Sequence, residues 1–246
     1  DDVGIPVVAI GPDVVPDDDQ VEISGLVLLY GEGSTHEGLD SEQIERARGD
    51  PVPLENVLFS VPEIIDYGAS AGSIQGLAGF SAQSFNLTVR GEPTQVLAGI
   101  VTGNFFEVMG LRPVSGRVMD EGDDGEAAAP VLVLTYDYWM GAFGGDPEIV
   151  GTTVDLGGGP ATVIGVVQQA PHYPERTDVM LNMVTSPHHL SATMVFGRTH
   201  RMTEVFGRLS PGGTIADAQS ELDGIGMRLR EEYPEAYEEA AGYSVS

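Results

Sequence analysis

The clearest hydrophobic pattern in this chain has helical spacing and lies near the C-terminus. Four apolar residues recur there at intervals of three and four: Ala218, Leu222, Ile225 and Leu229. Residues with this spacing share one face of a helix, which is then buried against a core. Thr214 is placed to cap the first turn, and Pro234 is expected to stop the helix. The pattern therefore predicts a long helix over residues 215–233.

Residues 99–117 hold a second pattern, which predicts a strand followed by a one-turn helix and a turn. Asn104 is the expected N-cap, because its side-chain oxygen can accept a hydrogen bond from an amide of the first turn. Gly110 suits the left-handed residue that closes a short helix. We expect Phe105 and Phe106 to hold the strand to the core beneath it. The stretch is therefore predicted to be structural, with no catalytic residue in it.

Alternating or continuous apolar runs predict β-strands in much of the remaining sequence. The expected strands cover residues 5–10, 21–30, 76–89, 94–102, 131–134, 152–156, 161–168, 204–209 and 243–246. The run at 131–134 is entirely apolar, as is typical of a strand inside a sheet. Glycines at 157–159 fit the tight turn of a hairpin. Residues 170–200 are rich in Pro, His and Met and are expected to be irregular.

Three shorter helices complete the prediction. Residues 41–48 begin with a capping serine followed by helix formers. A second helix begins after Ser60, with Pro62 in its first turn. Its expected buried residues are Ile64, Ile65 and Tyr67. The third helix covers residues 136–143, and three of its aromatic residues are expected in the core: Tyr138, Trp139 and Phe143.

The charge balance excludes some classes of partner. The 246 residues include 38 Asp and Glu against 11 basic residues, all of them Arg, for a net charge of −27. Such a surface repels nucleic acid and anionic lipid headgroups. The acidic residues are spread along the chain, which favours adaptation to high salt over one acidic patch for a basic partner. The high-salt prediction fails if the protein is equally stable at molar and millimolar salt.

Candidate chemistry is sparse. The absence of Cys removes disulfides, thiolate metal sites and thiol catalysis. The glycines at 157–159 lack the Lys-Ser/Thr of a phosphate loop. Residues 120–131 resemble half of a calcium loop, but Val131 stands where the bidentate Glu belongs, so a solvated acidic loop is expected. Four histidines, expected in loops, lack a metal-binding spacing: His172, His188, His189 and His200. We therefore assign no catalytic, cofactor-binding or metal-binding residue and expect no cofactor.

Several segments together resemble the periplasmic core domain of MacB-type permeases, in the FtsX-like superfamily of ABC transporters. Within that superfamily the resemblance is strongest to the duplicated orphan permeases. The segments that carry the resemblance are residues 60–67, 73–80, 85–93, 101–117, 133–147, 149–151, 162–167, 207–212 and 218–222. They keep the family's order over most of the chain, while residues 1–50 match poorly.

The resemblance implies an α+β fold in one extracytoplasmic domain, residues 1–246. A porter-like βαβ subdomain would comprise approximately residues 1–75 and 201–246. A β-rich, sabre-like subdomain would comprise approximately residues 76–200. In this family the domain lies on the periplasmic face of the cytoplasmic membrane, between the first two of four transmembrane helices. The chain would then be a soluble piece of a longer protein.

The resemblance also implies a role without catalysis. The expected role is substrate or partner contact, together with conformational coupling through transmembrane helices to a separate cytoplasmic ATPase. The expected partners are a homologous permease subunit or second copy of the domain, that ATPase, and a periplasmic adaptor or exported substrate. No nucleic acid is expected.

Two alternatives from other classes stay open at this stage. The first is a secreted or periplasmic ligand-binding or adhesion module. The second is a hydrolase that uses the His-rich segment 170–200, which would require a cleft holding His172 or His188 beside Ser and Asp. If the full-length gene encoded transmembrane helices on both sides of residues 1–246, the permease hypothesis would be favoured over both alternatives.

Overall fold

The chain folds as two compact units in a computed structural model, and each unit is described by itself. Unit 1 comprises Asp1–Leu77 and Val195–Ser246, and unit 2 comprises Ala78–Met194. The structure describes residues 7–10, 26–29, 59–89, 91, 93–125, 127–170, 176–183, 197–199 and 201–238. The helix expected at 41–48 and the strand expected at 243–246 lie outside these residues. Unit 2 is thus an insertion in the sequence of unit 1.

Unit 1 contains a layer of four neighbouring strands in the order β1-β2-β10-β3. Their bounds are Val7–Ile10 for β1, Leu26–Leu29 for β2, Glu204–Leu209 for β10 and Ile74–Thr88 for β3, of which only the first residues belong to unit 1. β2 pairs antiparallel with both β1 and β10. These four strands agree with the apolar runs in the sequence.

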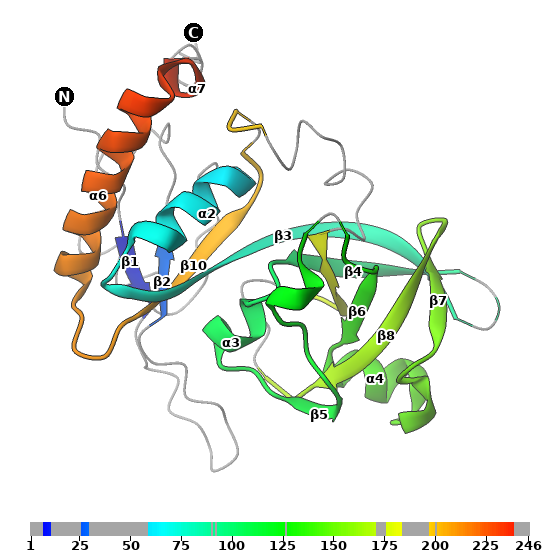
Figure 1. The fold of residues 1–246 in the computed structure, drawn as a ribbon. Coiled ribbons are helices and arrows are strands. Elements are labelled where there is room, and N and C mark those ends of the chain that lie inside the picture. Colours follow the sequence, from blue (N-terminus) through cyan, green and yellow to red (C-terminus); the bar gives the residue numbers. More distant parts are fainter. Residues whose placement is uncertain are drawn as a thin grey trace, which may run out of the picture. The chain divides into compact units, whose positions relative to one another are not determined.

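Among its described residues, unit 1 has three helices: α2 at Val61–Ser70, α6 at Ile215–Glu232 and α7 at Pro234–Glu238. Figure 1 shows α2 (cyan) and α6 (orange) beside the strands of this unit. Both longer helices begin with a reciprocal capping box, in which Ser60 pairs with Glu63 and Thr214 with Asp217. The apolar face predicted for α6 is confirmed, and its residues are at most 6% exposed. They share one core with residues of α2, β3 and β10.

One expectation for unit 1 is wrong. Ile65 is 64% exposed, and Glu63 is buried on the inner side of α2 instead. The exchange is possible because Glu63 has charged and polar partners, described below. The predicted stop at Pro234 is confirmed, because α6 ends at Glu232 with its C-cap at Tyr233, and a separate short helix, α7, begins at Pro234. Proline is tolerated at the first helical position, where its missing amide has no partner to lose.

Unit 2 is built around a closed ring of paired strands. The pairings run from β3 to β4, β9, β6, β8, β7 and back to β3, and β5 adds to β8. The bounds are Thr94–Val101 for β4, Pro113–Gly116 for β5, Val131–Leu134 for β6, Thr153–Leu156 for β7, Gly159–Val167 for β8 and Val179–Asn182 for β9. The ring closes through the short pairing of Leu87 and Thr88 in β3 with β7, and closure reduces the number of open strand edges.

The predicted strands of unit 2 are largely confirmed, but two strands were not predicted: β5, which lies where a turn was expected, and β9. The four residues of β6 are all buried between two neighbouring strands, as their apolar run indicated. The β7–β8 hairpin turns at Gly157 and Gly158, whose φ angles are 63° and 94°. However, residues 170–200 are not wholly irregular, because β9 lies within them. This four-residue strand closes the ring between β4 and β6.

The short helix predicted within residues 99–117 is present as α3, at Phe105–Met109. Phe105 and Phe106 are completely buried, and Gly110 has the expected left-handed φ of 73°. Asn104 is the N-cap residue as predicted, but the expected hydrogen bond is wrong, because the Asn104 side chain makes no capping hydrogen bond to the helix. Its Oδ1 accepts a hydrogen bond from the Thr102 hydroxyl at 2.8 Å instead. The local rule failed because a nearer donor satisfies the same oxygen.

The other helical elements in the described part of unit 2 are α4 at Tyr136–Phe143 and two 3-10 turns, η1 at Glu121–Asp123 and η2 at Pro147–Ile149. No residue of α4 is fully buried, so the expectation that its aromatic residues lie in the core is wrong in degree. Three of them pack half-buried against the outside of the ring's core: Tyr138, Trp139 and Phe143. None of the helices in the described part of the chain has the length and apolar character needed to cross a membrane.

Candidate functional site

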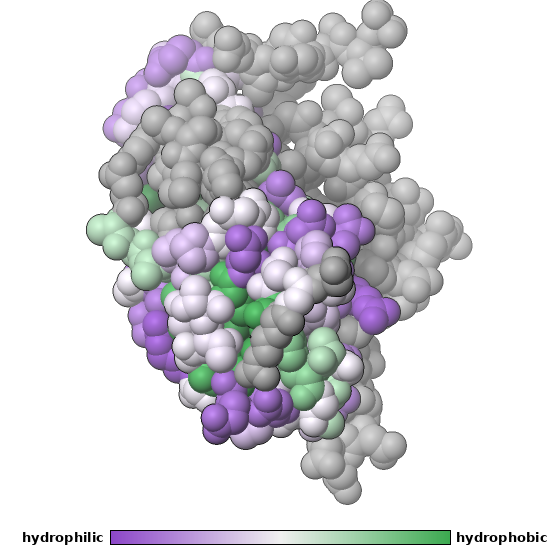
Figure 2. All heavy atoms as spheres, turned by 90° about the vertical axis from the view of Figure 1, so that its right-hand side faces the viewer, coloured by the Kyte–Doolittle hydropathy of each residue, from purple (hydrophilic) through white to green (hydrophobic). Residues whose placement is uncertain are grey.

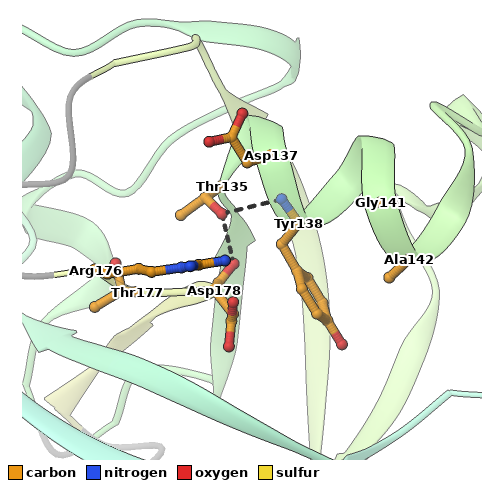
Figure 3. Close-up of a pocket in the computed structure, with 8 residues that line it drawn as sticks. All are labelled: Thr135, Asp137, Tyr138, Gly141, Ala142, Arg176, Thr177 and Asp178. Atoms are coloured by element: carbon orange, nitrogen blue, oxygen red, sulfur yellow. Dashed lines mark hydrogen bonds between the residues drawn. The ribbon is translucent and has the colours of Figure 1, made fainter.

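Two hollows in unit 2 flank helix α4 and share Tyr138 and Ala142 of that helix. We call them the polar hollow and the apolar hollow, and together the α4 groove. The polar hollow measures about 320 Å³ and is lined by Thr135, Asp137, Tyr138, Gly141, Ala142, Arg176, Thr177 and Asp178 (Figure 3). The apolar hollow measures about 360 Å³ and is lined by Leu87, Val89, Gly91, Thr94, Tyr138, Ala142, Phe143, Asp146 and Ile149.

The polar hollow is held open by hydrogen bonds between the start of α4 and the segment before β9. The Thr135 hydroxyl caps the Tyr138 amide and donates to the Asp178 carbonyl at 2.9 Å, as Figure 3 shows. The Asp178 carboxylate in turn accepts from the Leu97 amide of β4 at 3.0 Å. These bonds fix the helix start against two strands that are distant in sequence, so the hollow is preformed.

Charge in the polar hollow comes from two carboxylates and one guanidinium: Asp137, Asp178 and Arg176. Figure 3 shows the exposed Arg176 side chain extending toward Asp178. Burial and the nearby Asp178 charge raise the pKa of the Tyr138 hydroxyl, so this phenol stays neutral and able to donate a hydrogen bond. The hollow thus offers several polar groups around one aromatic ring.

The apolar hollow lies on the other side of Tyr138. Its lining includes Leu87 and Ile149, which are buried, and the half-buried Phe143. Figure 2, which faces the side that carries β7 and α4, shows a hydrophobic patch with hydrophilic residues around it. Nearby, the indole of Trp139 donates to the Asp146 carbonyl at 2.9 Å. Asp146 therefore lies at the edge of this hollow with its backbone fixed to α4.

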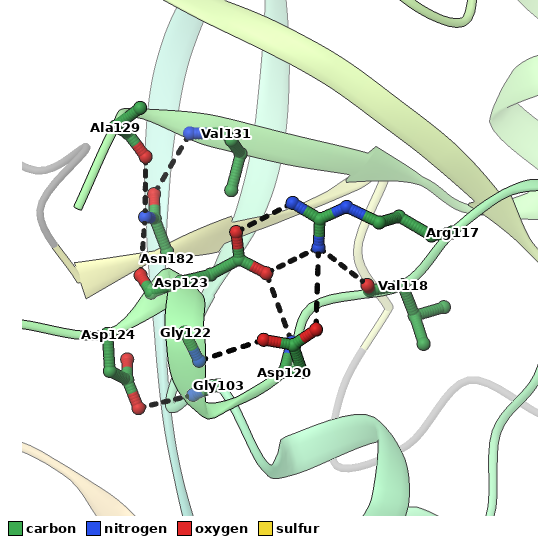
Figure 4. Close-up of polar contacts among 10 residues, drawn as sticks. All are labelled: Gly103, Arg117, Val118, Asp120, Gly122, Asp123, Asp124, Ala129, Val131 and Asn182. Atoms are coloured by element: carbon green, nitrogen blue, oxygen red, sulfur yellow. Dashed lines mark hydrogen bonds and ion pairs between the residues drawn. The ribbon is translucent and has the colours of Figure 1, made fainter.

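A second polar cluster fastens the acidic loop to unit 2 (Figure 4). Arg117 donates two hydrogen bonds to the Asp123 carboxylate, at 2.6 and 2.8 Å. These bonds lower the pKa of Asp123 below its ordinary value, against the opposing effect of burial. The expectation of a solvated loop is therefore wrong for Asp123, which is buried. The neighbouring Asp124 accepts from the Gly103 amide at 2.7 Å.

Asn182 at the end of β9 connects the same loop to the ring. Its amide nitrogen donates to the carbonyls of Asp123 and Ala129, and its oxygen accepts from the Val131 amide, at 2.8 to 3.1 Å. Asn182 is completely buried, so its side-chain amide depends on these three backbone groups for its hydrogen bonds. The cluster in Figure 4 is accordingly structural.

The sequence had assigned no site residue, and the structure places the groove where no motif pointed. Its lining comes from three separated parts of the chain, which no local pattern could bring together. Four histidines considered for a metal or a hydrolase lie outside the described residues: His172, His188, His189 and His200. Among the residues that are described, no group of three His, Asp or Glu is arranged to hold a metal ion.

Comparisons with known proteins identify the class to which this fold belongs. A family model described as "MacB-like periplasmic core domain" matches residues 18–225. The periplasmic region of MacB from Actinobacillus actinomycetemcomitans is similar with a TM-score of 0.59 at 14% identity, over 91% of this chain and 95% of that one. The extracellular domain of the noncanonic ABC-type transporter YknZ from Gram-positive bacteria is similar with a TM-score of 0.55 at 16% identity, over 85% and 95%.

A domain of a putative permease protein from Porphyromonas gingivalis gives a TM-score of 0.53 at 13% identity, over 73% of this chain and 75% of that one. The comparison with curated proteins finds no match. Because the family model covers most of the sequence, the chain belongs to the MacB-like periplasmic core domain family. It is thus a domain of an ABC transporter permease, and the predicted α+β class is confirmed.

Proposed function

We propose that this domain has no catalytic role and passes conformational changes between the membrane part of its permease and partners outside the membrane. In this proposal unit 1 is the porter-like subdomain and unit 2 is the sabre-like subdomain. The proposed partners are a second permease copy, a cytoplasmic ATPase reached through transmembrane helices, and an adaptor or exported substrate that contacts unit 2.

The observation that carries the proposal is how unit 1 holds the two places where the chain passes into unit 2. The first passage follows Leu77, and the second precedes Val195. Close to the second passage, Arg198 and Arg201 form ion pairs with Asp66 and Glu63 of α2, at 2.6 and 2.8 Å. Each pair links residues more than 130 positions apart in the sequence.

The first passage is held by a different group. The Glu221 carboxylate of α6 accepts hydrogen bonds from the amides of Gly72 and Ser73, at 2.9 and 2.7 Å, and from the Ser73 hydroxyl. These residues directly precede β3, the strand that continues into unit 2. Both passages are therefore fastened to helices of unit 1, while unit 2 is a closed ring. Such an arrangement suits the transfer of rigid-body motion.

Distance measurements between the units test this proposal. The chain has no Cys, so I65C in unit 1 and M140C in unit 2 would be the only label sites in the domain. Both native side chains are exposed, at 64% and 44%. In the full-length permease with its ATPase, we expect the spin-label distance distribution to change between the nucleotide-free and ATP-trapped states.

The matched control pair is V114C with M140C, which places both labels in unit 2 and should give the same distribution in both states. An unchanged I65C–M140C distribution contradicts the coupling role. A substrate turnover by the purified 246-residue chain, abolished by substitution of His172 or His188, would contradict the non-catalytic role and favour a hydrolase.

A further inference from the structure

Helix α4 stands out because it is rich in apolar residues and yet has none buried. Five of its eight residues are aromatic or Met, and Met140 is among the exposed large hydrophobic residues, at 44%. Its N-terminal cap and the Trp139 hydrogen bond hold it in place without burying it. A helix with hollows on two sides and a half-exposed apolar surface has the form of a docking surface.

The charges around the hollows indicate what kind of partner fits. Among the residues that the structure describes, three carboxylates line them, from Asp137, Asp178 and Asp146, against one basic side chain, Arg176. The whole chain carries a net charge of −27, so its field attracts cations and repels anions. A second copy of this chain would bring the same negative charge and no Lys. Charge complementarity therefore favours a basic partner.

The two hollows ask for different groups. The apolar hollow, lined by Leu87, Phe143 and Ile149 and also by the polar residues Thr94 and Asp146, suits one apolar side chain with polar neighbours. The polar hollow presents Asp137 and Asp178, which suit the guanidinium or ammonium group of a neighbouring residue. Because the hollows share Tyr138 and Ala142, both groups would belong to one short segment.

We propose that the α4 groove is the docking site for a basic amphipathic segment of a partner protein. An apolar side chain of that segment fills the hollow beside Phe143, and an Arg or Lys next to it pairs with Asp137 and Asp178. Arg176 stays at the rim of the groove, where its positive charge repels a segment that carries basic side chains and no apolar one. This docking does not depend on the mechanical role proposed above.

The single tryptophan provides a direct readout, since Trp139 lies on α4. The probe is a capped peptide with Leu-Phe-Leu at its centre and an arginine at each end. Titrated into the 246-residue chain, it should change the Trp139 fluorescence in a saturable manner. Between about 0.15 and 1 M salt the affinity should fall roughly tenfold, because exposed charge pairs are screened.

Two variants separate the contributions of the hollows. D137N/D178N should weaken binding at least about tenfold, a loss of the size expected for charged hydrogen bonds. The Asn at position 178 can still accept the Leu97 hydrogen bond, so the fold should persist. A142W fills the space shared by both hollows and should abolish binding. The matched control is E107Q/E121Q, which removes two exposed carboxylates that line neither hollow and should bind as the native chain does.

Three results would overturn the proposal. The first is equal binding of a peptide with glutamate in place of both arginines. The second is unchanged affinity in D137N/D178N whose circular dichroism matches that of the native chain. The third is self-association of the chain that A142W abolishes, since the occupant would then be a second copy. Peptide binding without a nucleotide-dependent distance change would support the docking site and contradict only the coupling role.

Discussion

Different kinds of polar interaction stabilise the interior of each of the two units. In unit 1, side chain pairs with side chain: Glu63 with Arg201, and Asp66 with Arg198, across more than 130 residues of sequence. In unit 2, most buried or half-buried polar side chains bond to the backbone, as Asn182, Asp178 and Thr135 do. The closed ring fixes its backbone through strand pairing, whereas α2 of unit 1 is joined to the segment before β10 by ion pairs between side chains.

This contrast has an energetic consequence. A buried ion pair has lost its water, so the loss of one partner leaves a costly charge behind. A buried backbone group that loses its partner costs less, because it carries only a partial charge. Unit 1 should therefore be the more sensitive to substitution of a single polar residue. Four predictions test the comparison, from the largest expected effect to the smallest.

R201M should have the largest effect. The Glu63 carboxylate is 5% exposed and, among the described residues, would keep only the hydrogen bonds from Ser60. We expect a loss of about 3–5 kcal/mol in the free energy of unfolding, measured by urea denaturation. Hydrogen exchange should increase most in α2 and α7, because Arg201 also contacts the Ala236 carbonyl. The exposed Arg228 of α6 gives the control, R228M, which should stay within about 0.5 kcal/mol.

N182L should have the next largest effect. It keeps the side-chain size and leaves the carbonyls of Asp123 and Ala129 and the Val131 amide without their partner. We expect a loss of about 3 kcal/mol, with hydrogen exchange raised in β6 and the acidic loop and not in α2. The exposed Asn86 gives the control N86L. A larger loss for N182L than for R201M would reverse the comparison.

D123N should cost about 1 kcal/mol at neutral pH, because half-exposed Arg117 keeps much of its hydration when the pair is weakened. The lowered pKa of Asp123 stabilises the fold above the ordinary carboxyl range, and this contribution is lost as the pH falls below about 4. The difference in the free energy of unfolding between the native chain and D123N should therefore be present at pH 7 and largely absent at pH 3. The control is E121Q, which replaces an exposed residue of the same turn. Its free energy of unfolding should depend on pH in the same way as that of the native chain.

E221Q should have the smallest effect, about 0.5–1 kcal/mol, because this half-buried carboxylate is partly screened by water. Hydrogen bonds from Ser73 and Gly72 lower the pKa of Glu221, so its contribution is also lost as the pH falls below the ordinary carboxyl range. The test is thermal unfolding at pH 7 and pH 3. An E221Q loss that persists unchanged at pH 3 would show that charge is not the cause.

Much of the fold could be predicted because the relevant signals are local. The period of α6, the capping boxes at Ser60 and Thr214, and the glycine turn of the β7–β8 hairpin each depend on residues a few positions apart. The errors at Ile65 and β9 arose where a distant residue changed the outcome, whereas the expected Asn104 hydrogen bond was lost to the nearby Thr102. The strand β9 was missed because it has only four residues, too few for a clear pattern. Its pairing with β4 and β6 makes it recognisable as a strand.

The candidate site could not be predicted at all. Residues 87, 137 and 178 line neighbouring hollows, but nothing in the sequence indicates that they lie near one another. Only the pairing of β3 with β7 and of β6 with β9 brings their segments together. The sequence did indicate an aromatic helix at 136–143, and its half-exposed position became visible only in the folded unit.

The sequence by itself determined the α+β class, the family resemblance, most helices and strands, and the strong negative charge, because periodicity, capping and composition act within a few residues. Only the tertiary structure decided that the six strands of unit 2 close into a ring and that Glu63 is buried while Ile65 is exposed. The reason is that a buried carboxylate depends on its partner, and that partner, Arg201, lies 138 residues further along the chain.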